Sequence, residues 1–144
     1  MKFFANAALF AAASAAAISQ RESTVFSVSD FSAGCIPHST QCAYGFSVIQ
    51  PGTMETTPVN CSALVQGAGG LLPDVKDAPC KESSRTFSVT RSADGLTLSV
   101  SQPVTPSSNQ TGSHLIPNDE LVTSNQPNAF VQSYAGPRSF DLTA

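Results

Sequence analysis

Hydrophobic and polar residues alternate at every second position in several short stretches of this chain, and no stretch beyond its N-terminal segment keeps a helical period. In the clearest stretch, Cys42, Tyr44, Phe46 and Val48 are separated by small or polar residues. Successive side chains of a strand face opposite sides, so these four residues are expected to share one buried face. A similar run at residues 25–29 could pair with this strand as a hairpin.

The strongest hairpin signal lies in residues 85–102, RTFSVTRSADGLTLSVSQ. Two alternating runs flank the pair Asp94-Gly95, which marks a turn between strands. Another run, Val59-Cys61-Ala63 at alternate positions, predicts a strand that points Cys61 into the core. Shorter strand candidates follow in ELVTS, AFVQSY and SFDL. These short runs, bounded by Gly, Pro, Asn, Asp and Ser, predict an all-β domain.

Two segments predict loops instead of strands. GAGGLLPDVKDAP, residues 67–79, is rich in Gly and Pro and predicts a surface excursion between two cysteines. QPVTPSSNQTG, residues 102–112, is polar and interrupted by prolines. A long polar loop in a small domain often carries function, although an idle connector fits the pattern equally well.

The N-terminal segment has the pattern of a secretory signal peptide. Lys2 precedes an alanine-rich apolar run that extends to Ala17 and is followed by polar residues. A membrane anchor is the alternative, but the run is shorter than the roughly 18 apolar residues that a span needs. Removal of residues 1–17 would leave residues 18–144 as one domain. Its expected core contains five phenylalanines, Phe26, Phe31, Phe46, Phe87 and Phe130.

Charged residues make up only 12% of the chain, and the formal net charge is −3. Nucleic acids and anionic lipids are bound by clustered Lys and Arg, which this sequence lacks. Neither is therefore an expected partner. Ser, Thr, Asn and Gln must supply most of the solvent-exposed polar surface, because charged residues are so few.

The four cysteines of the chain would pass through an oxidising compartment, which favours disulfides. Their spacing, from Cys35 and Cys42 to Cys61 and Cys80, lacks the C-x2-C pairs of a zinc site. A metal held by His38 and the two cysteines beside it would need thiolates that secretion oxidises. We therefore expect two disulfides and no metal. Four cysteines permit three connectivities, and the spacing alone leaves all three open.

Three further residues are candidates for surface roles. His38 lies between the first two cysteines in a stretch that predicts an exposed turn, as an idle surface residue or as part of a recognition loop. Two N-glycosylation sequons begin at Asn60 and Asn109. Asn109 lies in the predicted polar loop and is the better acceptor, whereas Asn60 adjoins a half-cystine in a predicted strand.

No motif for catalysis or cofactor binding stands out. The chain contains no G-x-S-x-G, H-E-x-x-H, P-loop or G-x-G-x-x-G pattern. Its histidines, His38 and His114, form no recognisable triad with a serine. Asp119 and Glu120 are adjacent, so on a strand they would face opposite sides, and a solvated turn suits them better. We therefore expect a non-enzymatic protein without a cofactor.

Three stretches carry a family resemblance: FSAGCIPHSTQCAYGFSV, the segment from Cys61 through LLPDVKDAPC, and RTFSVTRSADGLTLSVSQPV. Together they resemble the hypersensitive-response-inducing proteins secreted by plant-associated fungi. More distantly, the chain is similar to the Alternaria major-allergen family of secreted β-barrel proteins. There too a cysteine, a loop with a Leu-Pro step and a second cysteine precede a strand. This match implies pairing of Cys61 with Cys80, and leaves Cys35 with Cys42.

The resemblance implies a single-domain antiparallel β-barrel or sandwich, stapled by two disulfides, that acts as an elicitor in the plant apoplast. Such a protein triggers defence signalling and hypersensitive cell death. Its implied partner is a plant cell-surface or apoplastic protein, such as a thaumatin-like defence protein. With no spare cysteine, the covalent dimer of the allergens is not expected. Two other functions stay open: a barrel that carries a small apolar or phenolic ligand, and a hydrolase with an unrecognised site that involves His114.

Overall fold

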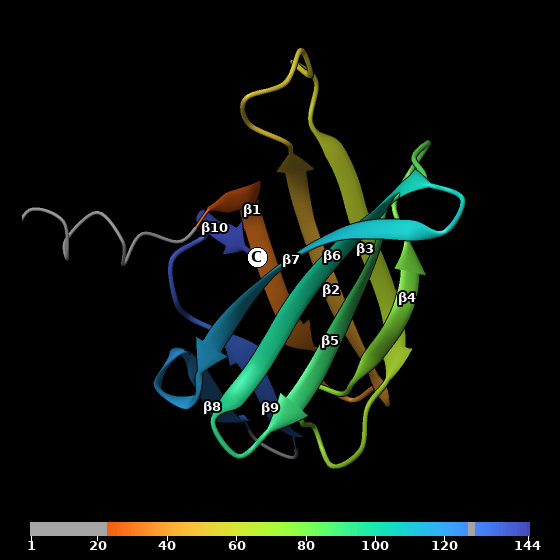
Figure 1. Cartoon of the computed structure of the whole chain (residues 1–144). Coiled ribbons are helices and arrows are strands. Elements are labelled where there is room, and N and C mark those ends of the chain that lie inside the picture. The colour runs from red at the N-terminus through yellow and green to blue at the C-terminus, as the bar shows by residue number, and fades with distance from the viewer. Residues whose placement is uncertain (1–22, 127–128) are drawn as a thin grey trace, which may run out of the picture.

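The computed structural model describes residues 23–126 and 129–144, so the predicted signal peptide, residues 1–17, lies outside the described residues. These residues form ten β-strands and one short 3₁₀ helix, η1 (Figure 1). In chain order the elements are β1 (Thr24–Cys35), β2 (Gln41–Ile49), β3 (Val59–Gln66), β4 (Val75–Pro79), β5 (Thr86–Ser92), β6 (Gly95–Thr105), β7 (Ser108–Pro117), η1 (Asn118–Glu120), β8 (Leu121–Gln126), β9 (Ala129–Tyr134) and β10 (Phe140–Thr143).

The strands form one antiparallel sheet that curls into a nearly closed barrel (Figure 1). The strand order is β3-β2-β1-β10-β7-β6-β5-β4, and the β8–β9 hairpin joins β1 through β9. The two outer strands of this path, β3 and β4, come together at an antiparallel bridge between Cys61 and Cys80. The expected all-β antiparallel fold is confirmed, and it is a barrel.

Both disulfides have the pairing that the family resemblance implied. Cys35 is bonded to Cys42, and Cys61 is bonded to Cys80. The first pair lies directly opposite across the β1–β2 hairpin, and the second joins β3 to the residue after β4. All four cysteines of the chain are therefore paired, and none is free for a covalent dimer.

The hairpin predicted across the first disulfide is present. β1 pairs with β2 from Ser27–Ile49 to Cys35–Cys42, with a β-bulge between Ser29 and Ser32. The alternating residues of β2 face inward as expected, because Cys42, Tyr44, Phe46 and Val48 are all buried. Cys61 on β3 is buried as well, so this strand also has the predicted orientation.

The hairpin predicted at residues 85–102 is β5–β6, with its turn one residue earlier than expected. Ser92 pairs with Gly95, so the turn consists of Ala93 and Asp94, and Gly95 is already the first residue of β6. Gly95 has φ +144°, and a Cβ atom at this position would overlap the carbonyl oxygen of Ile116. Glycine is required here for both reasons.

The barrel interior is filled by large apolar side chains. Phe26, Phe31, Phe46 and Phe87 are buried, as predicted from the sequence. The prediction for Phe130 is wrong, because this side chain is 50% exposed. Phe130 lies two residues before the buried Gln132, so both side chains point to the same side of β9. Phe130, however, lies at the rim of the barrel, beyond the packed interior.

The structure corrects both predicted loops, the first only in part. Residues 67–74 form a loop as predicted, but Leu72 within it is fully buried, and residues 75–79 form the strand β4. Residues 102–112 continue the β6–β7 hairpin, with Gln102 opposite Gln110 and Thr105 opposite Ser108. Backbone pairing needs no apolar side chains, which is why this polar stretch gave no strand signal. The C-terminal candidates were correct: they are β8, β9 and β10.

Candidate functional site

One end of the barrel is formed by the β1–β2 loop, by residues 67–74 between β3 and β4, and by the start of β9. The three segments are joined by backbone hydrogen bonds: Gly67 N donates to Thr40 O at 2.8 Å, and Gln132 N donates to Gly70 O at 2.8 Å. These bonds bring the predicted recognition loop next to β9, which the sequence pattern did not anticipate.

The β1–β2 loop, residues 36–40, is short and anchored on both sides. Cys35 and Cys42 are bonded at its base with 3.8 Å between their Cα atoms. Within it, Ser39 N donates to Ile36 O at 3.2 Å, and Gln41 N donates to Ser39 Oγ at 3.1 Å. His38 is exposed at the turn with φ 61°, a left-handed conformation that non-glycine residues seldom adopt. The prediction of an exposed turn at His38 is confirmed.

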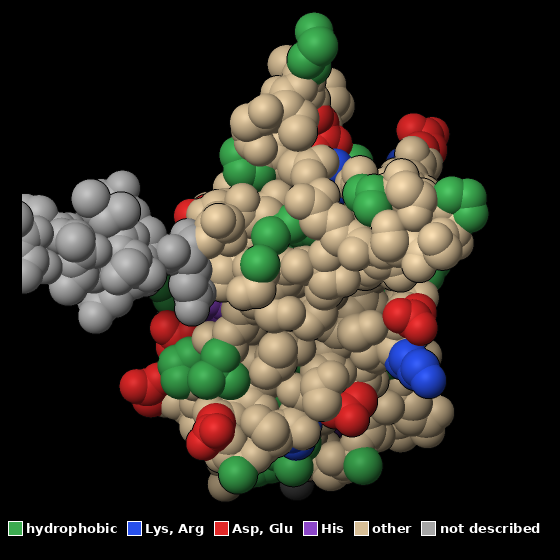
Figure 2. All heavy atoms as spheres, viewed as in Figure 1, with side chains coloured by type: hydrophobic (Ala, Val, Ile, Leu, Met, Phe, Trp, Pro, Cys, Tyr) green, Lys and Arg blue, Asp and Glu red, His purple; other side chains and the backbone are tan. Residues whose placement is uncertain are grey.

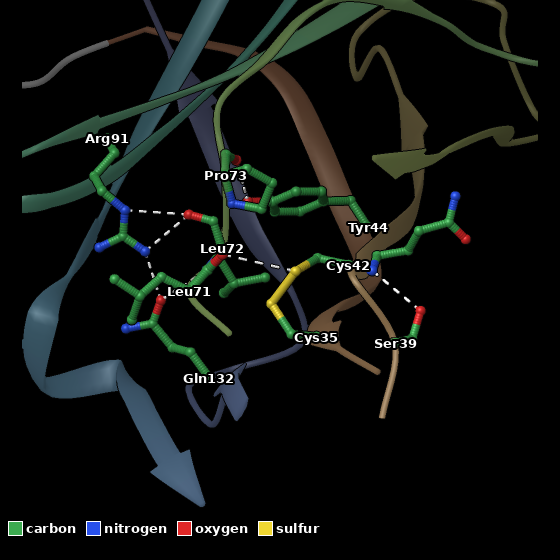
Figure 3. The surroundings of a disulfide bond; sticks show 10 residues. Cys35, Ser39, Cys42, Tyr44, Leu71, Leu72, Pro73, Arg91 and Gln132 are labelled. Atoms are coloured by element: carbon green, nitrogen blue, oxygen red, sulfur yellow. Dashed lines mark hydrogen bonds between the residues drawn. A yellow bond between two sulfur atoms is a disulfide. The ribbon is translucent and has the colours of Figure 1, made fainter. Parts of the chain in front are cut away.

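Residues 71–73 are held beneath this loop by polar contacts, most of them partly buried (Figure 3). Tyr44 Oη donates to Pro73 O at 2.7 Å, and burial raises the pKa of Tyr44 above its ordinary value. Arg91 donates to Leu72 O through Nε at 3.1 Å and through Nη2 at 2.8 Å. Gln132 Oε1 accepts from Leu72 N at 3.0 Å. The segment is therefore held from β2, β5 and β9 together.

The first disulfide packs against the same segment (Figure 3). Cys42 Sγ lies 3.7 Å from the carbonyl oxygen of Leu71. This is a packing contact and not a hydrogen bond, because a disulfide sulfur carries no proton. A Cβ atom on Gly67 would come within 2.7 Å of Cys42 Sγ, so only glycine fits against the sulfur without a shift. The disulfide therefore anchors the β1–β2 loop and also packs against Gly67 and Leu71 in the segment between β3 and β4.

An open groove of about 320 Å³ lies between the β1–β2 loop and β9. We call it the rim groove; its lining residues are Ile36, His38, Ser39, Thr40, Gly70, Ala129, Phe130 and Val131. Phe130 is 50% exposed and Ile36 is 40% exposed, so two large apolar side chains face solvent here. At Gly70, φ is +75° and a Cβ atom would overlap the carbonyl oxygen of Phe130, so glycine lets the two segments meet.

The rim groove has little charge. Among its lining residues in the described part of the chain, none is Asp, Glu, Lys or Arg, and the one imidazole is that of His38. The wider surface is similar: Figure 2 shows charged side chains scattered over a mostly uncharged polar face. The groove therefore offers a ligand hydroxyl and imidazole groups together with aromatic and aliphatic side chains.

The other predicted site residues lie apart from the rim groove. Asn60 is exposed on the outside of β3, where its Oδ1 accepts from Ser47 Oγ at 2.8 Å, and Asn109 is exposed near the start of β7. Both acceptor asparagines are therefore exposed in the folded protein, although Cys61, the middle residue of the Asn60 sequon, is buried. The expectation that Asn109 lies in a loop is wrong, since it pairs with Pro103 in the β6–β7 hairpin.

His114 is on β7 and does not line the rim groove with His38. Its ring stacks on Phe140 with 4.2 Å between the ring centroids and 17° between the planes. Burial lowers the pKa of His114, while the nearby Glu120 carboxylate opposes this shift. Asp119 and Glu120 belong to η1, after Pro117, so the predicted turn is present. Asp119 is exposed as expected, but Glu120 is half-buried, and its Oε1 is buried without a hydrogen-bond partner among the described residues.

The opposite end of the barrel contains an ion pair between a buried arginine and a partly exposed glutamate, which the sequence did not reveal. Arg85 is 5% exposed, and its Nη2 donates to Glu55 Oε1 at 2.8 Å. Its Nε donates to Gln102 Oε1 at 2.6 Å, and its guanidinium lies 5.2 Å from the centre of the Phe26 ring. Nothing in the sequence around Arg85 distinguishes it from a surface arginine, because its partners are 17 or more residues away.

The described residues contain no group of three or more His, Cys, Asp or Glu that could hold a metal ion. No helix in residues 23–126 or 129–144 is long and apolar enough to cross a membrane. Comparison of the chain with protein families, with curated proteins and with solved structures gave no significant match.

Proposed function

We propose that this protein is a secreted fungal elicitor that triggers plant defence and hypersensitive cell death through its folded surface, without catalysis. The observation that carries the proposal is the rim groove, in which the disulfide-anchored loop at His38 and the exposed ring of Phe130 form one concave surface. Exposed aromatic side chains in a preformed concavity are typical of recognition sites. The proposed partner is a plant cell-surface or apoplastic protein, such as a thaumatin-like defence protein.

The rigidity of the groove supports recognition of the folded protein over recognition of a linear peptide. Residues 36–40 are fixed at the Cys35–Cys42 disulfide, and Thr40 is tied to Gly67 by a backbone hydrogen bond. A preformed surface loses little conformational entropy on binding, which favours affinity. The partner contacts made by residues 36–40 are therefore expected to depend on the Cys35–Cys42 disulfide.

The alternative of an internal ligand carrier has less support. The positions that would line such a ligand site hold fully buried large side chains, among them Phe26, Phe31, Phe87, Leu96 and Leu142. A carrier of an apolar or phenolic molecule would need space inside the barrel that these side chains fill.

The proposal is tested by ion leakage from leaf tissue infiltrated with the purified protein. One sample is intact, and a matched sample has been reduced and alkylated at its four cysteines. We expect leakage from the intact protein only. Equal leakage from both samples would show that a linear peptide is sensed, and no leakage from either would refute the elicitor function.

The loop is tested separately with His38→Ala. His38 is exposed, so the variant should keep its unfolding midpoint, and it is expected to cause less leakage at equal dose. Unchanged leakage would remove His38 from the recognition surface. Ser107→Ala, in the two-residue turn between β6 and β7, serves as the control for a loop substitution remote in sequence from the rim groove.

A further inference from the structure

We infer that the rim groove binds an uncharged carbohydrate, with one sugar ring lying against Phe130. This inference rests on the proposed function, since it names the chemistry that the recognition surface would contact on its partner. Three properties of the groove lead to it: the absence of charge on its described lining, the exposed aromatic ring, and the hydroxyl and imidazole groups on its other wall.

The charge of the lining restricts the ligand first. An anionic ligand is normally held by Arg or Lys, and a cationic one by Asp or Glu. The described lining of the rim groove contains none of these four residue types. A charged ligand would lose part of its hydration here without an opposite charge in return, which is unfavourable. The ligand that fits is neutral.

The exposed ring restricts the ligand further. Phe130 keeps half of its surface in solvent although it belongs to a strand beside a packed core. The face of an aromatic ring carries partial negative charge and attracts groups with partial positive charge at their surface. The C–H face of a pyranose ring is such a group, and it is flat enough to lie on a phenyl ring. Phe130 therefore offers a platform for one sugar.

The opposite wall supplies hydrogen-bonding groups. His38, Ser39 and Thr40 follow one another on the β1–β2 loop and all line the groove. Ser39 Oγ already accepts from Gln41 N at 3.1 Å, which fixes the oxygen while leaving its proton free to be donated. An imidazole and two hydroxyls can donate to and accept from the hydroxyls of a sugar. A purely apolar ligand would make no hydrogen bonds with these groups, so the lining favours a ligand that has hydroxyl groups of its own.

The size and shape of the groove indicate how much of the carbohydrate is contacted. Its volume of about 320 Å³ is at the lower end of the range for small-molecule sites, and it is open along one side. It therefore holds one or a few sugar units of a longer chain that continues into solvent. The same chemistry occurs in cell-wall polysaccharides and in the glycans of glycoproteins, so the test includes both sources.

The inference is tested by NMR titration of the intact, oxidised protein, labelled with ¹⁵N. The wall probes are cellohexaose, laminarihexaose and hexa-N-acetylchitohexaose, and the glycoprotein probe is a mannose-rich N-glycan. A galacturonic acid hexamer tests the preference for neutral ligands, and catechol tests a small phenolic. We expect at least one neutral carbohydrate to shift the amide signals of Ile36, His38 and Val131 in a saturable manner.

Variants then show whether the ring is responsible. Phe130→Ala should weaken binding at least tenfold, whereas Phe130→Trp should retain it because a ring is still present. Leu115→Ala removes an equally exposed apolar side chain from β7, outside the groove, and should leave binding unchanged. Thermal unfolding of each variant establishes that it is folded.

The inference is overturned if no neutral carbohydrate binds, if catechol or the galacturonic acid hexamer binds more tightly, or if Phe130→Ala binds as well as the wild type. Failure here is distinguishable from failure of the elicitor function, because the titration needs no plant tissue. Leaf leakage without carbohydrate binding would retain the elicitor function and reject this inference. Carbohydrate binding that depends on Phe130, without leaf leakage, would retain this inference and reject the elicitor function.

Discussion

The Cys61–Cys80 disulfide is expected to contribute more to stability than any other single feature outside the apolar core. It joins β3 and β4, the two ends of the strand path, at the one bridge between them among the described residues. The perturbation is the double variant Cys61→Ala/Cys80→Ala. Both cysteines are buried, so alanine leaves no polar group without a partner.

The magnitude follows from the length of chain that the disulfide closes. The two cysteines are 19 residues apart. In the chain-entropy model, this loop corresponds to about 3.3 kcal/mol of stabilisation. The Cys35–Cys42 disulfide spans 7 residues and corresponds to about 2.5 kcal/mol by the same model. A domain of this size is stable by about 5–15 kcal/mol in total, so the loss is a large fraction of it.

The assay is urea unfolding followed by far-UV circular dichroism, because the chain has no tryptophan to report by fluorescence. With a slope of about 1–3 kcal/mol/M, the Cys61→Ala/Cys80→Ala variant should lose about 1–3 M in its midpoint. Cys35→Ala/Cys42→Ala is the matched control and should lose less. Hydrogen exchange should accelerate first in β3 and β4, where the barrel edges separate. A midpoint change near zero, or a larger loss in the control variant, would refute the reasoning.

Three further predictions concern single side chains. Gly95→Ala should destabilise the fold by about 1–3 kcal/mol in urea unfolding, because the new Cβ atom meets the backbone of Ile116 at a positive φ; wild-type stability would contradict this. Arg85→Met should lower the free energy of unfolding by about 1–3 kcal/mol, because Glu55 loses its cation. The double variant with Glu55→Gln should recover part of this stability. If it recovers none, the ion pair is not the cause of the loss. The pKa of His114 is lowered in the folded state, so folding favours the neutral imidazole. The stability that His114 contributes is therefore complete above its unfolded pKa near 6.5, and it declines as the pH falls toward the lower pKa of the folded state. Urea unfolding between pH 7 and pH 5 should therefore show a smaller decline for His114→Gln than for the wild type, and equal declines would reject this role.

Local pattern predicted the strands that have one apolar face. The alternation of Cys42, Tyr44, Phe46 and Val48 predicted β2 and its orientation, because burial on one side imposes a period of two. The same pattern gave no signal in residues 102–112, where both faces of the hairpin are polar and only backbone pairing defines the strands. Hydrophobic periodicity reflects burial, so it cannot predict a strand that is held only by backbone hydrogen bonds.

The candidate site was predicted only in part, for a related reason. The loop at His38 could be predicted, since two nearby cysteines and a proline mark a short closed turn. Phe130 was expected in the core because a phenylalanine in an alternating run is usually buried. Its place at the rim depends on Gly70 and Thr40, which lie 60 or more residues away and reach it only through the closed barrel. Such long-range contacts leave no mark on the local pattern.

The most direct test of the central claim is ion leakage from leaf tissue treated with equal doses of wild-type protein, Phe130→Ala and Leu115→Ala, each shown by circular dichroism to be folded. Both substitutions remove a half-exposed apolar side chain, but only Phe130 lines the rim groove. We predict that Phe130→Ala causes markedly less leakage, while Leu115→Ala acts like the wild type. Full leakage from Phe130→Ala would contradict the claim that the rim groove is the surface through which this protein acts.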